Sequence, residues 1–252
     1  MSNHIQDRLR RNQCVIGPFM KLPSPAVVEI AGLAGFDFVI IDCEHGPLDM
    51  LTAEDMIRAA KLRGISPVIR VSANEEVLIS RALDVGADAV QVPQIVTRAD
   101  AEKVVRAAKF APAGQRGVCR YVRAAEYTHV EKQHYFQQAN ADTLVIIHVE
   151  GEEGVQHIDE ILEVDGVDVI FLGPYDLSQS LGIPGEVNHP KVVRLMEEVI
   201  EKAGNKNKCI GTFADNTEAA EKWMKAGVQY MSYSVDVGII MDAFQKITKE
   251  LK

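Results

Sequence analysis

The strongest constraint on the fold is an apolar run that ends abruptly in ionisable residues. Residues 38–41 are continuously apolar, as in a parallel strand covered on both faces, and Asp42, Glu44 and His45 follow within four positions. Three ionisable groups cannot all be buried without partners. We therefore expect this strand to emerge at the mouth of a barrel or the edge of a sheet, where active sites are built.

Segments of strand length and segments of helix length alternate along the whole chain. Short β-branched runs alternate with amphipathic stretches of helix length, several of which begin at a capping residue. The predicted strands are Gln13–Phe19, Phe36–Asp42, Ser66–Arg70, Ala89–Val92, Leu144–Val149, Asp168–Leu172, Lys208–Phe213 and Gln229–Ser234. The predicted helices are Ser24–Ala34, Asp49–Arg63, Asn74–Asp84, Thr97–Lys109, Gly154–Leu162, Pro190–Ala203, Thr217–Ala226 and Val237–Leu251.

A chain of 252 residues with this alternation predicts an α/β fold, a single (β/α)8 TIM barrel over residues 1–252. The alternative is a doubly wound sheet, but no Gly-x-Gly-x-x-Gly loop follows the first predicted strand. Two insertions, residues 111–142 and 178–190, interrupt the rhythm. Insertions of that length are typical of lids, subunit contacts or disordered segments.

The net charge and the hydropathy of the sequence limit the classes of partner that the protein can bind. The net charge of −9 argues against nucleic acid, which requires a basic surface. No apolar run approaches the ~20 residues that cross a bilayer, and the first residues lack the apolar core of a signal peptide. We therefore expect a cytoplasmic protein with neither a nucleic-acid nor a membrane partner.

Polar residues stand at the ends of four predicted strands. Arg70 ends the third strand, and His148 and Glu150 share a face at the end of the fifth, because strand side chains alternate with a period of two. Asp176 follows the sixth strand beside a Gly-Pro turn. A barrel would gather all of these ends, with His45, at one face.

That set of side chains favours one kind of chemistry. Two carboxylates with open positions suit a divalent cation such as Mg²⁺ or Mn²⁺. An arginine orients a substrate carboxylate or neutralises an oxyanion, and a histidine beside a carboxylate is a common general base. Together they suit proton abstraction next to a carbonyl, or carbon–carbon cleavage through an enolate.

Each side chain also has a structural interpretation. Arg70 could be an ion-pair partner of Asp42 or Glu44. His148 could be a satisfied core histidine, and His45 could cap the following helix. The two carboxylates of the fifth and sixth strand ends could be salt-bridge partners at the rim. What favours function is that separate strands place these residues at the same end.

These residues also resemble a known family, the class II metal-dependent pyruvate aldolases of the 4-hydroxy-2-oxoheptanedioate aldolase type, in the phosphoenolpyruvate/pyruvate barrel superfamily. Relatives of that type include sugar-acid aldolases. The resemblance extends over nearly the whole chain. It rests on Ala34-Gly-Phe-Asp, Ile41-Asp-Cys-Glu-His45, Val68-Ile-Arg70, Leu83-Asp-Val-Gly-Ala87, Val92-Pro93, Arg116-Gly-Val118, Val149-Glu150, Gly166-Val-Asp and Leu172-Gly-Pro-Tyr-Asp-Leu-Ser178.

The resemblance implies a lyase that reversibly cleaves a 4-hydroxy-2-oxo acid to pyruvate and an aldehyde through a metal-stabilised pyruvate enolate. Glu150 and Asp176 would ligate Mg²⁺, Mn²⁺ or Co²⁺, and Arg70 would stabilise the enolate oxygen. His45 would be the acid/base. Asp84 would pair with His45, although its position at the end of a predicted helix alone would indicate solvated surface.

It further implies that Gly173 and Tyr175 contact the pyruvate carboxylate. Two positions depart from the family pattern: His148 stands where Gln is common, in a substrate-binding position, and Tyr175 replaces a small residue. The resemblance also implies a hexamer, a trimer of dimers that exchange the last helix, Val237–Leu251.

Three alternatives stay open. The first is an oxaloacetate decarboxylase of the same fold, with or without capture of the enolate by another electrophile. The second is a non-catalytic barrel that binds a metabolite. The third is a lyase for an acyl-CoA substrate, which only the arginines of residues 111–127 support.

Overall fold

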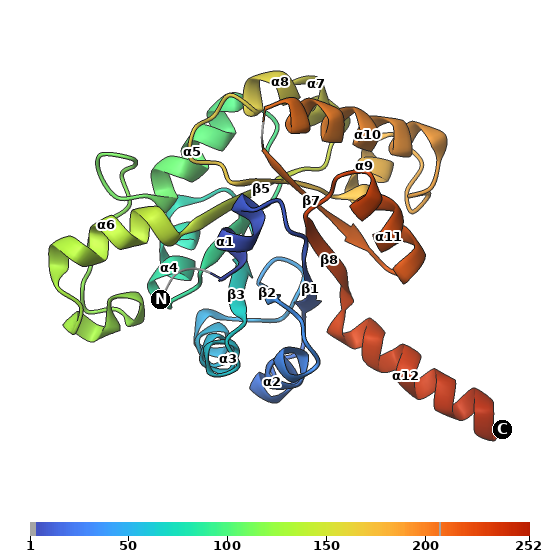
Figure 1. Ribbon diagram of the computed structural model, residues 1–252, viewed down its shortest axis with the longest axis horizontal. Coiled ribbons are helices and arrows are strands. Elements are labelled where there is room, and N and C mark those ends of the chain that lie inside the picture. The colour runs from blue at the N-terminus through green and yellow to red at the C-terminus, as the bar shows by residue number, and fades with distance from the viewer. Residues whose placement is uncertain (1–3, 207) are drawn as a thin grey trace.

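The computed structural model describes residues 4–206 and 208–252, and its centre is a closed barrel of eight parallel strands (Figure 1). The strands are β1 (Val15–Met20), β2 (Phe38–Asp42), β3 (Ser66–Arg70), β4 (Ala89–Val92), β5 (Leu144–Val149), β6 (Val169–Leu172), β7 (Cys209–Ala214) and β8 (Tyr230–Val235). Each strand pairs with the next, and β8 returns to pair with β1. The predicted TIM barrel is confirmed, and the doubly wound alternative is wrong because such a sheet has two open edges.

Helices surround the barrel and connect its strands. They are α1 (His4–Arg10), α2 (Pro25–Leu33), α3 (Met50–Leu62), α4 (Glu76–Asp84), α5 (Arg98–Ala108), η1 (Arg123–Thr128), α6 (Lys132–Asp142), α7 (Glu152–Gln156), α8 (Ile158–Ile161), α9 (Pro174–Ser180), α10 (Pro190–Asn205), α11 (Thr217–Lys225) and α12 (Asp236–Leu251). The predicted helix at Gly154–Leu162 is divided at His157, where the backbone leaves helical geometry. The sequence patterns did not predict α1, η1, α6 or α9.

The barrel interior and the layer outside it form separate cores. Inward-facing residues such as Phe38, Val68 and Ile146 pack with Ile5 and Leu9 of α1, which closes the amino end of the barrel. Residues of the opposite parity pack against the helices in a larger outer core. This alternation also turns the last inward-facing residue of each strand toward the carboxyl mouth of the barrel.

The insertion over residues 111–142 is ordered and lies at the amino end of the barrel. It forms η1 and α6 around a small core of its own, built on Phe110, Ala125 and Tyr135. Arg116 returns to the end of α5, where its backbone N–H donates to the carbonyl of Lys109 at 2.9 Å. Within one chain, this insertion is therefore not a lid over the carboxyl mouth.

The last helix, α12, stands apart from the other helices. It contacts β1 and β8 and projects away from the barrel, with the carboxyl terminus at its tip (Figure 1). Large exposed apolar side chains recur along one side of it: Val237, Met241, Phe244, Ile247 and Leu251. No helix in the described part of the chain combines the length and the apolar character that a bilayer crossing requires.

Candidate active site

The carboxyl ends of the strands surround a pocket of about 140 Å³. Most of the predicted site residues meet there, although they come from strands far apart in the sequence. The pocket is lined by Phe19, Lys21, Arg70, His148, Glu150, Phe171, Gly173, Pro174, Tyr175, Asp176, Phe213 and Val235. His45 and Asp84 are the two predicted residues that do not line it.

A buried ion pair holds Arg70 in place. The register of β2 and β3 sets Asp42 opposite Arg70. Arg70 Nε and Nη2 donate to the two Asp42 carboxylate oxygens at 2.9 and 2.8 Å, and Nη1 lies 2.9 Å from Glu44 Oε2. Lys21 Nζ lies 3.1 Å from Asp42 Oδ2. The ion-pair interpretation of Arg70 is therefore confirmed, and it leaves the remaining guanidinium N–H groups for the pocket.

The electrostatics of this cluster follow from burial and from Arg70. Burial acts to raise the pKa of Asp42, but the hydrogen bonds and charge of Arg70, with Lys21, lower it to about 2. Burial raises the pKa of Glu44, with Arg70 opposing and Glu150 adding to the rise. Asp42 is therefore the permanent anion that fixes the guanidinium.

Glu150 and Asp176 approach each other across Gly173. A Cβ atom at Gly173 would lie 2.8 Å from Glu150 Oε2 and 3.7 Å from Asp176 Oδ2, so any side chain there would fill the space beside both carboxylates. Burial raises the pKa of Asp176, and the nearby Glu150 charge raises it further. Burial acts the same way on Glu150, but His148 and the Gln94 N–H outweigh it and lower the pKa.

These two carboxylates fit a divalent cation. Two close carboxylates repel each other unless a positive charge lies between them, and Gly173 keeps that space free. The described residues include no group of three or more His, Cys, Asp or Glu side chains arranged to hold a metal. The protein side chains would therefore supply two ligands, and substrate and water would supply the others. Hard cations such as Mg²⁺ are commonly bound in this way, by one or two carboxylates together with substrate and water.

His148 is buried beside this pair, with 1% of its surface exposed. Its Nδ1 lies 2.8 Å from Glu150 Oε2, its Nε2 contacts the amide of Gln91, and its ring stacks on Phe171 at 4.4 Å between centroids. Both ring nitrogens therefore have partners, as the core-histidine interpretation requires. His148 is nevertheless one of the residues that line the pocket.

His45 lies outside the pocket lining. Its side chain is 60% exposed, and its Nε2 is 3.9 Å from Glu44 Oε2. Its backbone N–H donates to Asp42 Oδ1 at 3.2 Å, which fixes the turn after β2. The structure therefore places His45 at the rim, next to the carboxylate that contacts Arg70.

Within one chain, Asp84 does not meet His45. Asp84 ends α4, which runs back toward the start of β4, so it lies at the amino end of the barrel, whereas His45 follows the carboxyl end of β2. Asp84 Oδ1 accepts from Arg116 Nη2 at 2.6 Å instead. The helix direction, which is opposite to the strands, excludes contact between the two within a single barrel.

Gly173 and Tyr175 stand at the start of α9. Gly173 is its N-cap and Pro174 its first residue, so the N–H groups of the first turn have no partner inside the helix. The Tyr175 hydroxyl donates to Asp215, and this hydrogen bond, with burial, raises the pKa of Tyr175 to about 12. Its ring meets Phe213 edge-on at 6.0 Å, which makes a wall between the ends of β6 and β7.

Several lining residues were missed. Phe19 and Lys21 lie at the end of β1, where the apolar run gave no chemical signal. A lysine directly after a strand end nevertheless follows the same rule as the other site residues. Gln91 is fully buried in β4 and its side chain contacts that of Tyr230 in β8. A glutamine inside an otherwise apolar strand was the available signal for it.

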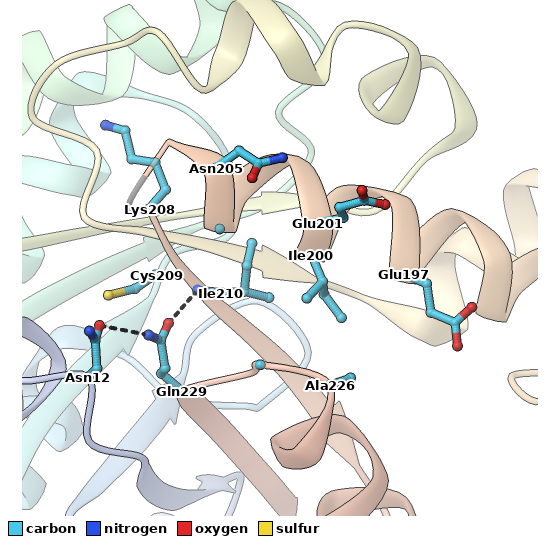
Figure 2. Close-up of a pocket in the computed structure, with 12 residues that line it drawn as sticks. Asn12, Glu197, Ile200, Glu201, Asn205, Lys208, Cys209, Ile210, Ala226 and Gln229 are labelled. Atoms are coloured by element: carbon cyan, nitrogen blue, oxygen red, sulfur yellow. Dashed lines mark hydrogen bonds between the residues drawn. The ribbon is translucent and has the colours of Figure 1, made fainter.

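A larger hollow, about 550 Å³, lies at the opposite end of the barrel, along α10, β7 and the start of β8 (Figure 2). Gln229 there joins Asn12 to the backbone N–H of Ile210, at 3.2 and 3.3 Å. Its other lining side chains include Glu197 and Glu201 but no residue from the carboxyl ends of the strands. We therefore place the candidate active site at the smaller pocket.

Comparisons with known proteins show which family the chain belongs to. The sequence profile of the HpcH/HpaI aldolase/citrate lyase family matches residues 16–243. A 5-keto-4-deoxy-D-glucarate aldolase from Escherichia coli O6:H1 is 34% identical over 250 residues, which cover 99% of this chain and 97% of that one.

Two solved structures are similar over nearly their whole length. One is an HpcH/HpaI aldolase/citrate lyase family protein from Burkholderia cenocepacia J2315, with a TM-score of 0.95, 35% identity and 99% of each chain covered. The other is the citrate synthase SbnG, with a TM-score of 0.88 and 31% identity over 99% of this chain and 98% of that one.

Proposed function

The chain belongs to the HpcH/HpaI aldolase/citrate lyase family and is a carbon–carbon lyase, and we propose that it reversibly cleaves a 4-hydroxy-2-oxo acid to pyruvate and an aldehyde. One observation carries the proposal. Glu150 and Asp176 meet across the space that Gly173 keeps free, beside the fixed guanidinium of Arg70. A pocket with this arrangement suits a 2-oxo acid whose enolate must be stabilised.

We propose that Glu150 and Asp176 hold a divalent cation, with Mg²⁺, Mn²⁺ and Co²⁺ as the ions to test. Such a cation, when bound, supplies positive charge that favours the enolate form of pyruvate. The backbone at Gly173 and Tyr175 would receive the pyruvate carboxylate, because the N–H groups of the first turn of α9 have no partner inside the helix.

Arg70 and His45 would perform the remaining steps. In the cleavage direction His45, directly or through one water, takes the proton of the C4 hydroxyl; the C3–C4 bond breaks and its electron pair forms the enolate of pyruvate. Arg70 stabilises the enolate oxygen, and pyruvate is completed when the proton taken from the hydroxyl is returned to C3 through water. In condensation the same imidazole returns the proton to the aldehyde oxygen. Asp42 and Glu44 hold the guanidinium so that it need not reorganise during the reaction.

The relatives suggest the first substrate to test. Counted from its keto end, 5-keto-4-deoxy-D-glucarate is itself a 4-hydroxy-2-oxo acid, so cleavage at C3–C4 would give pyruvate and an aldehyde. The aldolase named for that compound is 34% identical to this chain. We propose this compound, or a sugar acid like it, as the substrate.

A second function, oxaloacetate decarboxylation, is favoured by the position of His45. Decarboxylation needs the cation site and Arg70 but no base for an aldol hydroxyl. His45 is 60% exposed and does not line the pocket. A decarboxylase, which needs no base at that position, is compatible with this arrangement. The similarity to a citrate synthase supports the related alternative that another electrophile captures the enolate.

The decisive experiment compares the two reactions in one set of variants. Purified enzyme with Mg²⁺ or Mn²⁺ is given 5-keto-4-deoxy-D-glucarate or oxaloacetate, and pyruvate release is followed. We expect His45→Ala to lower aldol cleavage ~10²–10⁴-fold, as loss of an acid/base does, and to leave decarboxylation largely unchanged. Asp176→Ala should abolish both.

His134→Ala is the matched control, because His134 is an exposed histidine on α6, which lies in the insertion at the amino end. If His45→Ala lowers both reactions equally, the assigned role of His45 is wrong. If turnover is independent of metal and survives Asp176→Ala, the cation site is wrong, and a barrel without turnover on any of these compounds would be a metabolite-binding protein.

We further propose that the chain self-associates through α12 as a hexamer, a trimer of dimers. The exposed apolar side of α12, with Phe244 63% exposed at its centre, supports this. Such an assembly could bring Asp84 of one chain to His45 of another, a contact that one barrel cannot make. Light scattering of the same enzyme preparations should give the mass of six chains, and a monomer would contradict it.

A further inference from the structure

A line of buried polar side chains crosses the barrel interior beneath the pocket and ends on Glu150. The hydroxyl of Tyr230 lies 3.2 Å from Gln91 Oε1. The amide nitrogen of Gln91 contacts His148 Nε2, and His148 Nδ1 lies 2.8 Å from Glu150 Oε2. Tyr230, Gln91 and His148 are each at most 1% exposed. Three strands, β4, β5 and β8, therefore contribute to one buried network.

The chemistry of these groups fixes the direction of each hydrogen bond. Among the described residues, Gln91 Oε1 is the one hydrogen-bond partner of the Tyr230 hydroxyl, so the hydroxyl must donate to it. Burial raises the pKa of Tyr230 well above 10, which keeps the proton on the hydroxyl. The Gln91 carbonyl therefore accepts, and its NH₂ group faces the imidazole.

The Gln91 NH₂ can only donate, so His148 Nε2 must accept. A ring nitrogen that accepts carries no proton, and the ring proton then lies on Nδ1 and is donated to Glu150. With the amide turned the other way, its NH₂ would face the Tyr230 hydroxyl, whose own proton would have no acceptor. Among the described residues, only the first orientation gives the Tyr230 hydroxyl and both ring nitrogens of His148 a partner.

Packing holds the ring in the plane that this network needs. The imidazole of His148 stacks on Phe171 with an interplanar angle of 21°, and the two residues are direct neighbours across β5 and β6. Tyr230 stacks on Phe38 at 4.3 Å between centroids, with an interplanar angle of 13°. Neither ring can turn without losing its stacking partner.

Glu150 receives one donor on each of its oxygens. Oε2 accepts from His148, and Oε1 accepts from the backbone N–H of Gln94 at 2.9 Å. Each carboxylate oxygen has lone pairs to spare, and the two donors fix the plane in which those lone pairs lie. Oε2 is also the atom that a Cβ at Gly173 would approach, so the free lone pairs face the space beside Asp176.

We propose that Gln91 and Tyr230 are positioning residues that hold His148 as its Nδ1–H tautomer, and that His148 thereby orients Glu150 toward a cation. The orientation of a metal-binding side chain by a hydrogen bond from a neighbouring group is a general feature of metal sites. This rests on the function proposed above in one respect, that Glu150 is a cation ligand. The tautomer itself does not depend on it.

The tautomer can be measured in the metal-free protein. Chain labelled with ¹⁵N-histidine is examined by long-range ¹H–¹⁵N correlation, and the His148 signals are assigned by their loss in His148→Asn. We expect a protonated Nδ1 and an unprotonated Nε2. A protonated Nε2, alone or together with Nδ1, overturns the proposal.

The effect on Glu150 is measured by Mn²⁺ binding, followed by calorimetry and by the electron paramagnetic resonance signal of free Mn²⁺. Gln91→Leu removes the donor to Nε2, and we expect mixed His148 tautomers and an affinity for Mn²⁺ lower by roughly tenfold or more. His148→Asn places an amide N–H near the position of Nδ1–H and should retain most of the affinity, whereas His148→Leu should not.

Gln6→Leu is the matched control, since Gln6 is also a buried glutamine but lies on α1 at the amino end. It should leave the His148 tautomer and the Mn²⁺ affinity unchanged. Equal affinity in Gln91→Leu and wild type, or equal loss in His148→Asn and His148→Leu, would overturn the positioning role. If wild-type protein has the predicted tautomer but binds no Mn²⁺, the proposed cation site fails while the tautomer assignment stands.

Discussion

The strand β2 has an aspartate at each end, and the two are held by similar contacts. Asp42 at the carboxyl end accepts from Nε and Nη2 of Arg70 and from the backbone N–H of His45. Asp37, just before the strand, contacts Arg8 and accepts from the backbone N–H of Ile16 at 2.9 Å. An arginine and a backbone amide thus satisfy each carboxylate.

The difference lies in what each arginine faces. Asp42 is fully buried, and its Arg70 lines the pocket, within reach of Glu44 and the other site residues. Arg8 comes from α1, which closes the amino end, and its other hydrogen bond goes to the carbonyl of Cys14 at 2.6 Å. The same pairing therefore orients a charge toward the pocket at one end of the strand and holds the helix that closes the barrel at the other.

The largest effect is expected for Asp42→Asn. The amide cannot match the charge of a buried guanidinium, and breaking a buried pair costs about 3 kcal/mol or more. Because Arg70 is no longer fixed, turnover should also fall roughly 10²-fold, the loss typical for one misplaced oxyanion donor. Urea unfolding, followed by the fluorescence of the single tryptophan, Trp223, measures the loss of stability. The rate of pyruvate release measures the loss of turnover.

The acid dependence of stability sharpens this prediction. The pKa of Asp42 is about 2 in the folded protein, against 3.8 ordinarily, so its contribution to stability is present above about pH 4 and is lost as the pH falls toward 2. A difference of that size corresponds to roughly 2 kcal/mol. The Asn variant should lack this part of the acid dependence. Parallel acid unfolding curves for the two proteins would contradict the assignment.

The fold and most of the pocket could be predicted from the sequence for a physical reason. The alternation of strand and helix patterns gives the number of βα units, and in a barrel the carboxyl ends of all strands lie at one face. The convergence of Arg70, Glu150 and Asp176 could therefore be predicted without any knowledge of side-chain contacts. The strand register then made Asp42 and Arg70 neighbours. Local pattern and global topology agreed at these positions.

Prediction failed where the answer depends on contacts across the barrel. Gln91 and Tyr230 belong to strands that are far apart in sequence, and no local pattern indicates that both contact the network at His148. The pairing assigned to Asp84 came from resemblance, and helix direction overrules it within one chain. The element α9 was missed because a Gly-Pro turn conceals a short helix that begins at its proline.

A smaller effect is expected for Asp37→Asn, the counterpart of the first change at the other end of β2. The pair with Arg8 is partly exposed, with 18% and 30% of the two side chains accessible, so its loss should cost about 1 kcal/mol in unfolding free energy. Turnover per folded molecule should be unchanged, because no part of this pair reaches the pocket. An activity loss comparable to that of Asp42→Asn would mean that the two ends do not differ as described.

The sharpest challenge to the comparison is expected for Asp84→Asn. Asp84 pairs with Arg116 at the amino end, and because the Arg116 side chain is only 2% exposed, loss of the carboxylate charge should lower the unfolding free energy by about 1–3 kcal/mol. If chains associate so that Asp84 orients His45 of a neighbour, aldol cleavage should still fall roughly tenfold, as it does when the partner of a reactive side chain is lost. Decarboxylation, which needs no such base, would be the internal control. Unchanged cleavage in this variant would mean that Asp84 stabilises only the amino end of its own barrel, as Asp37 does. A selective loss of cleavage would mean that Asp84, at the amino end of one barrel, acts on the site at the carboxyl mouth of another.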